Sequence, residues 1–78
     1  MMLEVSKVSM TEKIRIVLVK RGNMSEAELA RRIGIAPQNL NRKMNRDNFT
    51  ESDLIKIATA LNCTFEAGFR FDDTGEIV

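Results

Sequence analysis

Residues 25–40 read Ser-Glu-Ala-Glu-Leu-Ala-Arg-Arg-Ile-Gly-Ile-Ala-Pro-Gln-Asn-Leu, and this stretch decides the fold. Its first half predicts a helix, because Ser25 and Glu28 have the spacing of a capping box and Gly34 can adopt the positive φ that ends a helix. A second helix opens at Pro37, since the fixed φ of proline suits the first helical position. Two short helices joined by a tight turn with a glycine cross steeply, which leaves the first turns of the second helix exposed.

Apolar side chains on both sides of the turn are spaced to bury this join. Met24 and Leu29 flank the first cap at the spacing of a hydrophobic staple, and Ile35 and Leu40 stand in staple positions around the start of the second helix. Ala30 is small where the two helices approach each other. The pattern therefore predicts a helix-turn-helix unit with a buried inner face.

Two further helices flank this unit. Ser9 begins a helix over residues 9–21 and Thr50 begins one over residues 50–62, and each is followed three positions later by an acidic residue that completes a capping box. The first contains β-branched residues that would also suit a strand, but its apolar spacing favours a helix. The predicted core consists of Ile14, Leu18, Leu29, Ala30, Ile33, Leu40, Leu54, Ile57, Ala58 and Leu61.

The period changes after the fourth helix. Residues 65–71 alternate between apolar side chains, including Phe65, Phe69 and Phe71, and polar residues or glycine, which predicts a strand. Residues 72–75 signal a turn, and residues 76–78 are expected to return as a short second strand. Because an isolated two-stranded hairpin is marginal in water, either its aromatic face covers the domain's own helices or its edge pairs with a second copy.

Length and composition restrict the class of protein. The chain has 78 residues, enough for one domain near the lower limit for a self-sufficient core. Its 44% hydrophobic and 29% charged residues are ordinary for a folded soluble protein. The most apolar stretch, residues 14–19, is too short to cross a bilayer, and the amino terminus lacks the layout of a signal peptide. We therefore expect a cytoplasmic protein without a membrane partner.

Cysteine and histidine are too scarce for several kinds of site. There is one cysteine, Cys63, and no histidine, so we expect no internal disulfide, no zinc cluster and no Cys-His or Ser-His nucleophile. Cys63 is expected to be a small core or helix-end residue. The acidic pair Asp72 and Asp73 lies in a predicted turn without surrounding chain to form a cleft. We expect no cofactor, no small-molecule ligand and no enzymatic activity.

The net charge of +1 hides an uneven distribution. Residues 1–46 hold ten Lys or Arg and four Glu, a balance of +6, whereas residues 47–78 hold two Lys or Arg and seven Asp or Glu, a balance of −5. One interpretation is a basic working face with an acidic remainder, and the other is two halves that attract each other within the fold.

These features together resemble the Cro/lambda-repressor (XRE-type) helix-turn-helix family over about residues 11–62. The resemblance rests on SEAELARRIGI at residues 25–35, a polar third helix, and LIKIATAL at residues 54–61. It implies that the third helix, about residues 37–45, is a recognition helix for the major groove of double-stranded DNA. The matching exposed positions are Pro37, Gln38, Asn39, Asn41 and Arg42.

Three positions depart from the family pattern. Glu26 stands where many members have a glutamine that contacts phosphate. Lys43 stands where an apolar residue is usual, and Met44 where an acidic residue is usual. Because Met44 follows Leu40 by four residues, we expect Met44 to take the core position, with a slight rotation of the helix that shifts the base contacts.

The side chains of the third helix suit base reading. Asn and Gln can form two hydrogen bonds with adenine, and Arg can do so with guanine. These amides are also poorer helix formers than Glu, Lys or Ala. We assign base contacts to Gln38, Asn39, Asn41 and Arg42, and phosphate contacts to Pro37, Lys43 and Arg46. The alternative is an ordinary solvated polar face. Arg31 and Arg32 are expected to pair with acidic residues rather than to read bases.

The sequence thus predicts a mainly α protein, a four-helix lambda-repressor-like helix-turn-helix domain with a short C-terminal β-strand or hairpin. Residues 1–8 form an N-terminal arm, residues 9–62 the DNA-binding domain, and residues 63–78 a β element of the same domain. The predicted function is sequence-specific transcriptional regulation by a homodimer that associates through the C-terminal strand. The alternative is a protein-interaction or antitoxin-like module on the same fold, which the acidic half and the Phe-rich strand favour.

Overall fold

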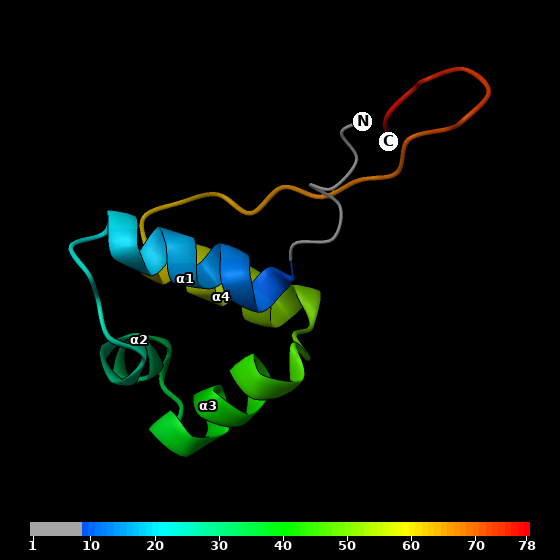
Figure 1. Ribbon diagram of the computed structural model, residues 1–78. Coiled ribbons are helices and arrows are strands. Elements are labelled where there is room, and N and C mark those ends of the chain that lie inside the picture. The colour runs from blue at the N-terminus through cyan, green and yellow to red at the C-terminus, as the bar shows by residue number, and fades with distance from the viewer. Residues whose placement is uncertain (1–8) are drawn as a thin grey trace.

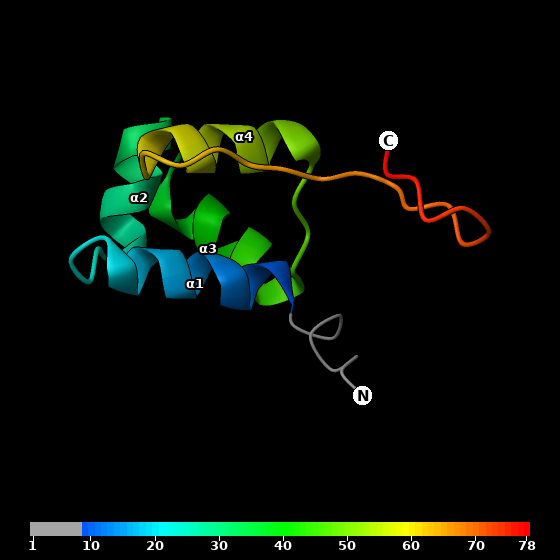
Figure 2. The same ribbon diagram turned by 90° about the horizontal axis from the view of Figure 1, so that it is seen from above.

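Four helices make up most of residues 9–78, the part of the chain that the computed structural model describes. The expected arm, residues 1–8, lies outside that part. The helices are α1 (Met10–Lys20), α2 (Glu26–Ile33), α3 (Pro37–Arg46) and α4 (Glu51–Ala60). Figure 1 shows α1 and α4 above α2 and α3, and Figure 2 shows the same four helices from above. None of the four is long and apolar enough to cross a membrane.

The helix ends lie where the capping residues predict them. Ser9 and Thr50 each begin a helix with a complete capping box. Ser25 also caps its helix, since its hydroxyl accepts a hydrogen bond from the Glu28 backbone N–H at 3.0 Å. The expected second hydrogen bond of the capping box, from the Ser25 backbone N–H to the Glu28 carboxylate, is not formed. The carboxylate instead accepts hydrogen bonds from Arg31 and Arg32.

The turn between α2 and α3 has the predicted left-handed glycine. Gly34 has φ of 80°, and the next backbone N–H, that of Ile35, donates to the carbonyl of Ala30 at 3.0 Å. Pro37 is the first residue of α3, and Ala36 before it makes no side-chain cap. A proline at this position removes one N–H group that would have no helical partner, so α3 begins without a capping side chain.

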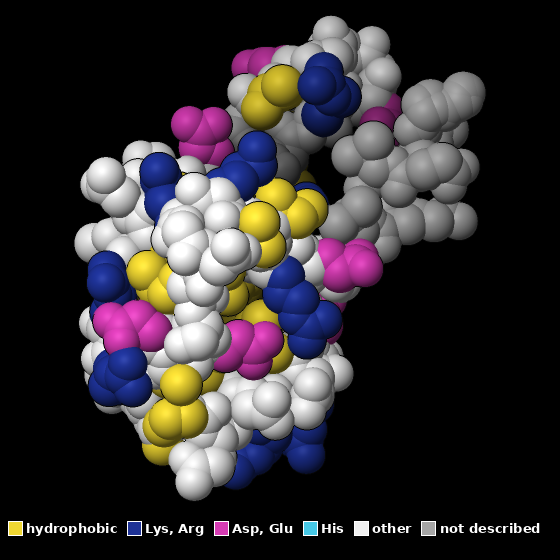
Figure 3. Space-filling view, turned by 60° about the vertical axis from the view of Figure 1, so that its left-hand side comes forward, with side chains coloured by type: hydrophobic (Ala, Val, Ile, Leu, Met, Phe, Trp, Pro, Cys, Tyr) yellow, Lys and Arg dark blue, Asp and Glu magenta, His cyan; other side chains and the backbone are white. Residues whose placement is uncertain are grey.

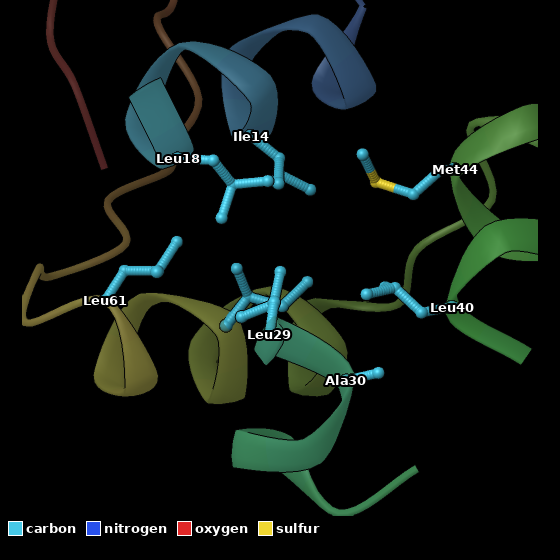
Figure 4. Close-up of a cluster of buried hydrophobic side chains, with 8 residues drawn as sticks. Ile14, Leu18, Leu29, Ala30, Leu40, Met44 and Leu61 are labelled. Atoms are coloured by element: carbon cyan, nitrogen blue, oxygen red, sulfur yellow. The ribbon is translucent and has the colours of Figure 1, made fainter. Parts of the chain in front are cut away.

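The core lies between the four helices, and each of them contributes to it (Figure 4). Its buried members are Ile14, Leu18, Leu29, Ala30, Leu40, Met44, Ile57 and Leu61. Met44 is 2% exposed, so the expectation that it takes a core position is confirmed. The predicted core residues Ile33, Leu54 and Ala58 are only partly buried, at the margin of the cluster.

Two polar contacts between distant parts of the chain were not predicted. The hydroxyl of Thr11, a buried residue of α1, donates to the Met44 carbonyl at 2.7 Å and to the Asp47 carboxylate at 3.0 Å. The Arg21 guanidinium donates to the carbonyls of Leu61 and Asn62, at 2.8 and 3.1 Å, where α4 ends. Together these contacts fix α1 to the carboxyl ends of α3 and α4.

Residues 65–71 do not form the predicted strand. From Met10 to Val78 the structure contains no strand, and the C-terminal segment has one antiparallel bridge, between Arg70 and Ile77. The expected turn at residues 72–75 and the return of the chain after it are both present. The backbone hydrogen bonds join Phe69 to Val78 and Phe71 to Glu76, so only the end of the predicted strand is paired.

The first part of the C-terminal segment stays on the helical body. Phe65 and Cys63 line an apolar groove between α1 and α4, with Val17 and Leu54 among its other residues. Cys63 is partly buried against the core just after α4, as expected for a helix-end residue. Beyond the groove, the chain leaves the body and the hairpin projects from it (Figures 1 and 2).

Candidate nucleic-acid interface

The packing of the inner face of α3 against the core determines which of its side chains point outward. Leu40 is 0% exposed and Met44 is 2% exposed, one helical turn apart, and both point into the core (Figure 4). The remaining side chains of the helix therefore face outward. Every residue assigned to a base contact is exposed, namely Gln38, Asn39, Asn41 and Arg42.

Hydrogen bonds between side chains order this face. The Arg42 guanidinium donates to the Asn39 amide oxygen at 3.3 Å, and the Asn45 amide donates to that of Asn41 at 3.2 Å. Asn45 was not among the predicted site residues, although its position four residues after Asn41 places it on the same side of the helix. All four side chains present donors or acceptors of the kind that reads base edges.

A hollow lies between the start of α2 and the face of α3. Its lining residues are Glu26, Ala27, Pro37, Gln38, Asn41, Arg42, Asn45 and Arg46. The Glu26 carboxylate forms an ion pair with Arg15 of α1, with 3.6 Å between Oε2 and Nε. A carboxylate at this wall repels anions, and the positive charge of Arg15 partly offsets this repulsion.

Several cations near the turn are already paired with carboxylates. Arg31 and Arg32 both bind Glu28, the latter at 2.9 Å, as expected for acid-pairing residues. Hydrogen bonds from Arg32 and Arg31 hold the pKa of Glu28 below its usual value. On the face drawn in Figure 3, basic and acidic side chains are accordingly interspersed rather than separated.

The three cations of α3 differ in their surroundings. Lys43 is half-buried and its Nζ lies 3.0 Å from Asp53 Oδ2, at the start of α4. Within residues 9–78, Arg42 and Arg46 have no carboxylate at ion-pair distance. The predicted phosphate contacts are therefore unequal, because Lys43 is engaged within the protein whereas Arg46 is exposed and lines the hollow.

Asp53 links α3 to the cap of α4, and its charge makes the stability of this junction depend on pH. The Thr50 backbone N–H donates to Asp53 Oδ2 at 3.0 Å. This hydrogen bond, followed by the one from Lys43, lowers the pKa of Asp53. A lowered pKa means that the ionised carboxylate stabilises the fold above the ordinary aspartate value of about 3.9, and that this contribution is lost as pH falls through the folded-state value.

We therefore expect Asp53→Asn to cost about 1 kcal/mol of unfolding free energy near neutral pH, as for a lost cap. The difference from the original protein should shrink as pH falls from about 4 towards the lowered pKa. Urea unfolding of both proteins across this range measures it. Glu51→Gln, which removes a charge from the same turn, is the matched control. A difference that stays constant with pH would contradict this prediction.

Within the described residues, no group of three or more Cys, Asp or Glu side chains is placed to hold a metal ion. The outer face of α3 is the surface with functional groups: it is polar along its first two turns and carries Arg42 and Arg46, which have no carboxylate at ion-pair distance within residues 9–78. Its chemistry is that of hydrogen bonding to bases and attraction to phosphate.

Comparison with known families agrees with this geometry. The model of the Cro/C1-type helix-turn-helix DNA-binding domain matches residues 13–66, well over half of the chain. This range begins at Lys13 within α1 and contains the whole of α2, α3 and α4, with the turn at Gly34 between α2 and α3. Members of this family bind DNA and are not enzymes. No curated protein and no solved structure matched the chain. The chain therefore belongs to the Cro/C1-type helix-turn-helix family of DNA-binding domains.

Proposed function

We propose that this protein is a sequence-specific transcriptional regulator that reads DNA with α3. The observation that carries the proposal is the contrast between the two faces of α3. Leu40 and Met44 fix one face in the core, while the other presents exposed amides, of which Asn41 accepts from Asn45 and Asn39 accepts from Arg42. Among residues 9–78, Arg42 and Arg46 have no carboxylate at ion-pair distance. A surface helix kept only for solubility has no need of this combination, because Glu, Lys or Ala would form the helix better.

Within this proposal, Gln38, Asn39, Asn41 and Arg42 contact bases from the first turns of α3. Pro37, at the helix start, sets register through the nearby backbone N–H groups, and Arg46 binds phosphate. Lys43 is assigned to phosphate as well, but it must share its ammonium group with Asp53, so its contribution is expected to be smaller than that of Arg46. We add Asn45 to the residues that face the bases, because its amide donates a hydrogen bond to the side chain of Asn41.

We further propose that the protein acts as a homodimer in the cytoplasm. Residues 1–8 are an N-terminal arm, and the segment at residues 63–78 belongs to the same domain as the helices. A symmetric pair would place two copies of α3 about 34 Å apart, in successive major grooves of a palindromic site. The projecting C-terminal hairpin is the part of the molecule available for this association, because it lies away from α3 (Figure 1).

Substitutions on α3 should separate base reading from phosphate binding. Replacing Gln38 or Arg42 by Ala is expected to weaken binding to the preferred site by about 1–3 kcal/mol and to relax the choice of base. Replacing Arg46 should weaken binding to all sequences alike and reduce the salt slope by about one unit. The site is first selected from random DNA, and affinities are then measured over a salt series on specific and scrambled duplexes.

The matched control is Lys56→Ala, which removes an exposed cation from α4 rather than α3. It should change neither the base preference nor the affinity by more than a small factor. If the Gln38 and Arg42 variants lose specific and scrambled binding equally, α3 is not the reader and this proposal fails.

The second candidate function is a protein-interaction or antitoxin-like module on the same fold. One observation favours it, namely that the hairpin exposes four large apolar side chains, Phe69, Phe71, Ile77 and Val78. DNA binding that is weak, insensitive to salt and indifferent to sequence would favour this candidate over a regulator.

A further inference from the structure

Two arginines lie along the middle of the outer face of α3. A second hollow borders α3 beside the loop that follows it, and its lining residues are Ile35, Asn39, Arg42, Lys43, Arg46 and Asn48. Arg42 and Arg46 also line the first hollow, beside the start of α2. A helical side chain that borders a hollow on each side stands on the ridge between the two. These two arginines therefore lie at the centre of the surface that α3 presents.

The two arginines of this ridge differ in their surroundings. The Arg42 guanidinium donates from Nη1 to the Asn39 amide oxygen at 3.3 Å, and the two residues are three positions apart, the spacing of neighbours on a helix surface. Within residues 9–78, Arg46 has neither a side-chain hydrogen bond nor a carboxylate at ion-pair distance. Arg42 is thus oriented by a neutral amide, which does not cancel its charge.

A base contact and a phosphate contact make different demands on an arginine. Guanine has two acceptors on its major-groove edge, N7 and O6, and a guanidinium binds both only when its plane meets that edge. A phosphate can be reached from more directions, because its oxygens lie along the outside of the duplex. A side chain that is already oriented loses less conformational freedom when it binds. Arg42 has five N–H donors and the bond to Asn39 uses one of them, so enough remain for both acceptors of guanine.

We propose that Arg42 reads a guanine in the major groove and that Asn39 is a positioning residue, which orients the guanidinium instead of reading a base itself. This deepens the proposed function and rests on it, since it names one base of the site and the residue that selects it. It also narrows the part of Asn39 in that function from a base contact to the orientation of Arg42. Arg46, without such a partner among the described residues, remains suited to phosphate.

The amide of Asn39 is engaged in a way that does not suit adenine. Reading adenine with two hydrogen bonds requires an amide oxygen to accept from N6 while the amide nitrogen donates to N7. The oxygen of Asn39 already accepts from Arg42. Asn39 also lines the second hollow, whereas Gln38 and Asn41 line the first. Asn39 therefore lies across the arginine ridge from these two amides.

Base selection with single variants tests the proposal. The motif bound by the original protein is selected from random DNA, and affinities are then measured on duplexes that carry each of the four bases at each position. One position should prefer guanine, and Arg42→Ala should reduce that preference by about five- to a hundredfold. Asn39→Ala should reduce the preference at the same position by about two- to tenfold, because Arg42 then loses the hydrogen bond that orients it.

The position at which Asn39→Ala acts separates a positioning residue from a base reader. If Asn39 acts through Arg42, the double variant Asn39→Ala/Arg42→Ala loses no more guanine preference than Arg42→Ala alone. Gln38→Ala is the reference for an independent reader, since it should relax a different position. The inference is overturned if Asn39→Ala relaxes a position of its own, or none.

A conservative variant supplies the rescue. Asn39→Asp keeps an acceptor for Arg42, so the guanine preference should survive although the added carboxylate weakens binding to every sequence. Asn48→Ala is the matched control and should keep the preference, because it removes an amide from the same hollow that is not the one bonded to Arg42. Urea unfolding checks that each variant is folded. Loss of the preference in Asn39→Asp, or an equal loss in Asn48→Ala, contradicts the assigned role of Asn39.

Failure here is distinguishable from failure of the proposed function. If selection yields no motif, α3 does not read DNA and both proposals fail. If a motif is selected and responds to Gln38→Ala, but contains no guanine that depends on Arg42, the proposed function stands and only this inference fails.

Discussion

Leu29→Ala is expected to lower the free energy of unfolding by about 2–5 kcal/mol. Leu29 is 0% exposed and lies among side chains from all four helices (Figure 4), so no single neighbour can move to fill the space left by its side chain. Because domains have only about 5–15 kcal/mol of net stability in total, a loss of this size populates the unfolded state measurably in a chain of 78 residues. Leu40→Ala, at the inner face of α3, should behave similarly.

Denaturant unfolding of the purified variants measures this loss. Ile55→Ala is the control, since Ile55 is 50% exposed on α4 and its truncation should change stability by less than about 1 kcal/mol. A Leu29→Ala variant that unfolds at the same denaturant concentration as the original protein would show that the assigned inner face of α2 is wrong.

Local chemistry explains why the helix-turn-helix unit was predictable. Ser25, Gly34 and Pro37 each act on the backbone within a few residues, through a cap, a left-handed φ and a fixed φ. The apolar spacing then determines which faces meet, and Met44 could be placed in the core from its distance to Leu40 alone. For the same reason the exposed residues of α3 could be predicted from the sequence.

The C-terminal segment shows the limit of pattern reading. The alternation over residues 65–71 is a property of one strand, but a strand exists only with a partner that satisfies its backbone. Phe69 and Phe71 are hydrogen-bonded to Val78 and Glu76, whereas residues 65–67 make no backbone hydrogen bond with another described residue. Alternation in a sequence therefore indicates a segment that is able to pair, but it does not show that a pairing strand is present.

Contacts between polar groups far apart in the chain could not be read from spacing. Lys43 appeared to be a phosphate ligand because it lies on α3, but its ion pair with Asp53 depends on how α3 packs against α4. Thr11 and Asp47 are separated by 36 positions, and nothing in their local sequences indicates that they meet. Contacts with bases also depend on the DNA. For α3 the sequence therefore predicts which side chains are exposed and which hydrogen bonds they can form, and the contacts themselves stay predictions.

Asp47→Ala is expected to cost about 2–3 kcal/mol, because one carboxylate performs two structural tasks. Its Oδ1 accepts hydrogen bonds from the Thr11 backbone N–H at 2.8 Å and from the Thr11 hydroxyl at 3.0 Å. The first of these supplies a partner for a free N–H group in the opening turn of α1. Asp47 also ends α3 with φ of 53°, a left-handed conformation that Asp and Asn tolerate and Ala does not.

Three substitutions separate these two contributions in denaturant unfolding. Asp47→Asn keeps an acceptor oxygen and tolerates the left-handed conformation, so it should cost under about 1 kcal/mol. Asp47→Gly relieves the backbone but removes the acceptor, so it should fall between the Asn and Ala variants. Thr11→Val removes the hydroxyl donor, and combined with Asp47→Ala it should show a coupling energy of about 0.5–3 kcal/mol. Additive losses in that double variant would mean that the two residues stabilise the fold independently.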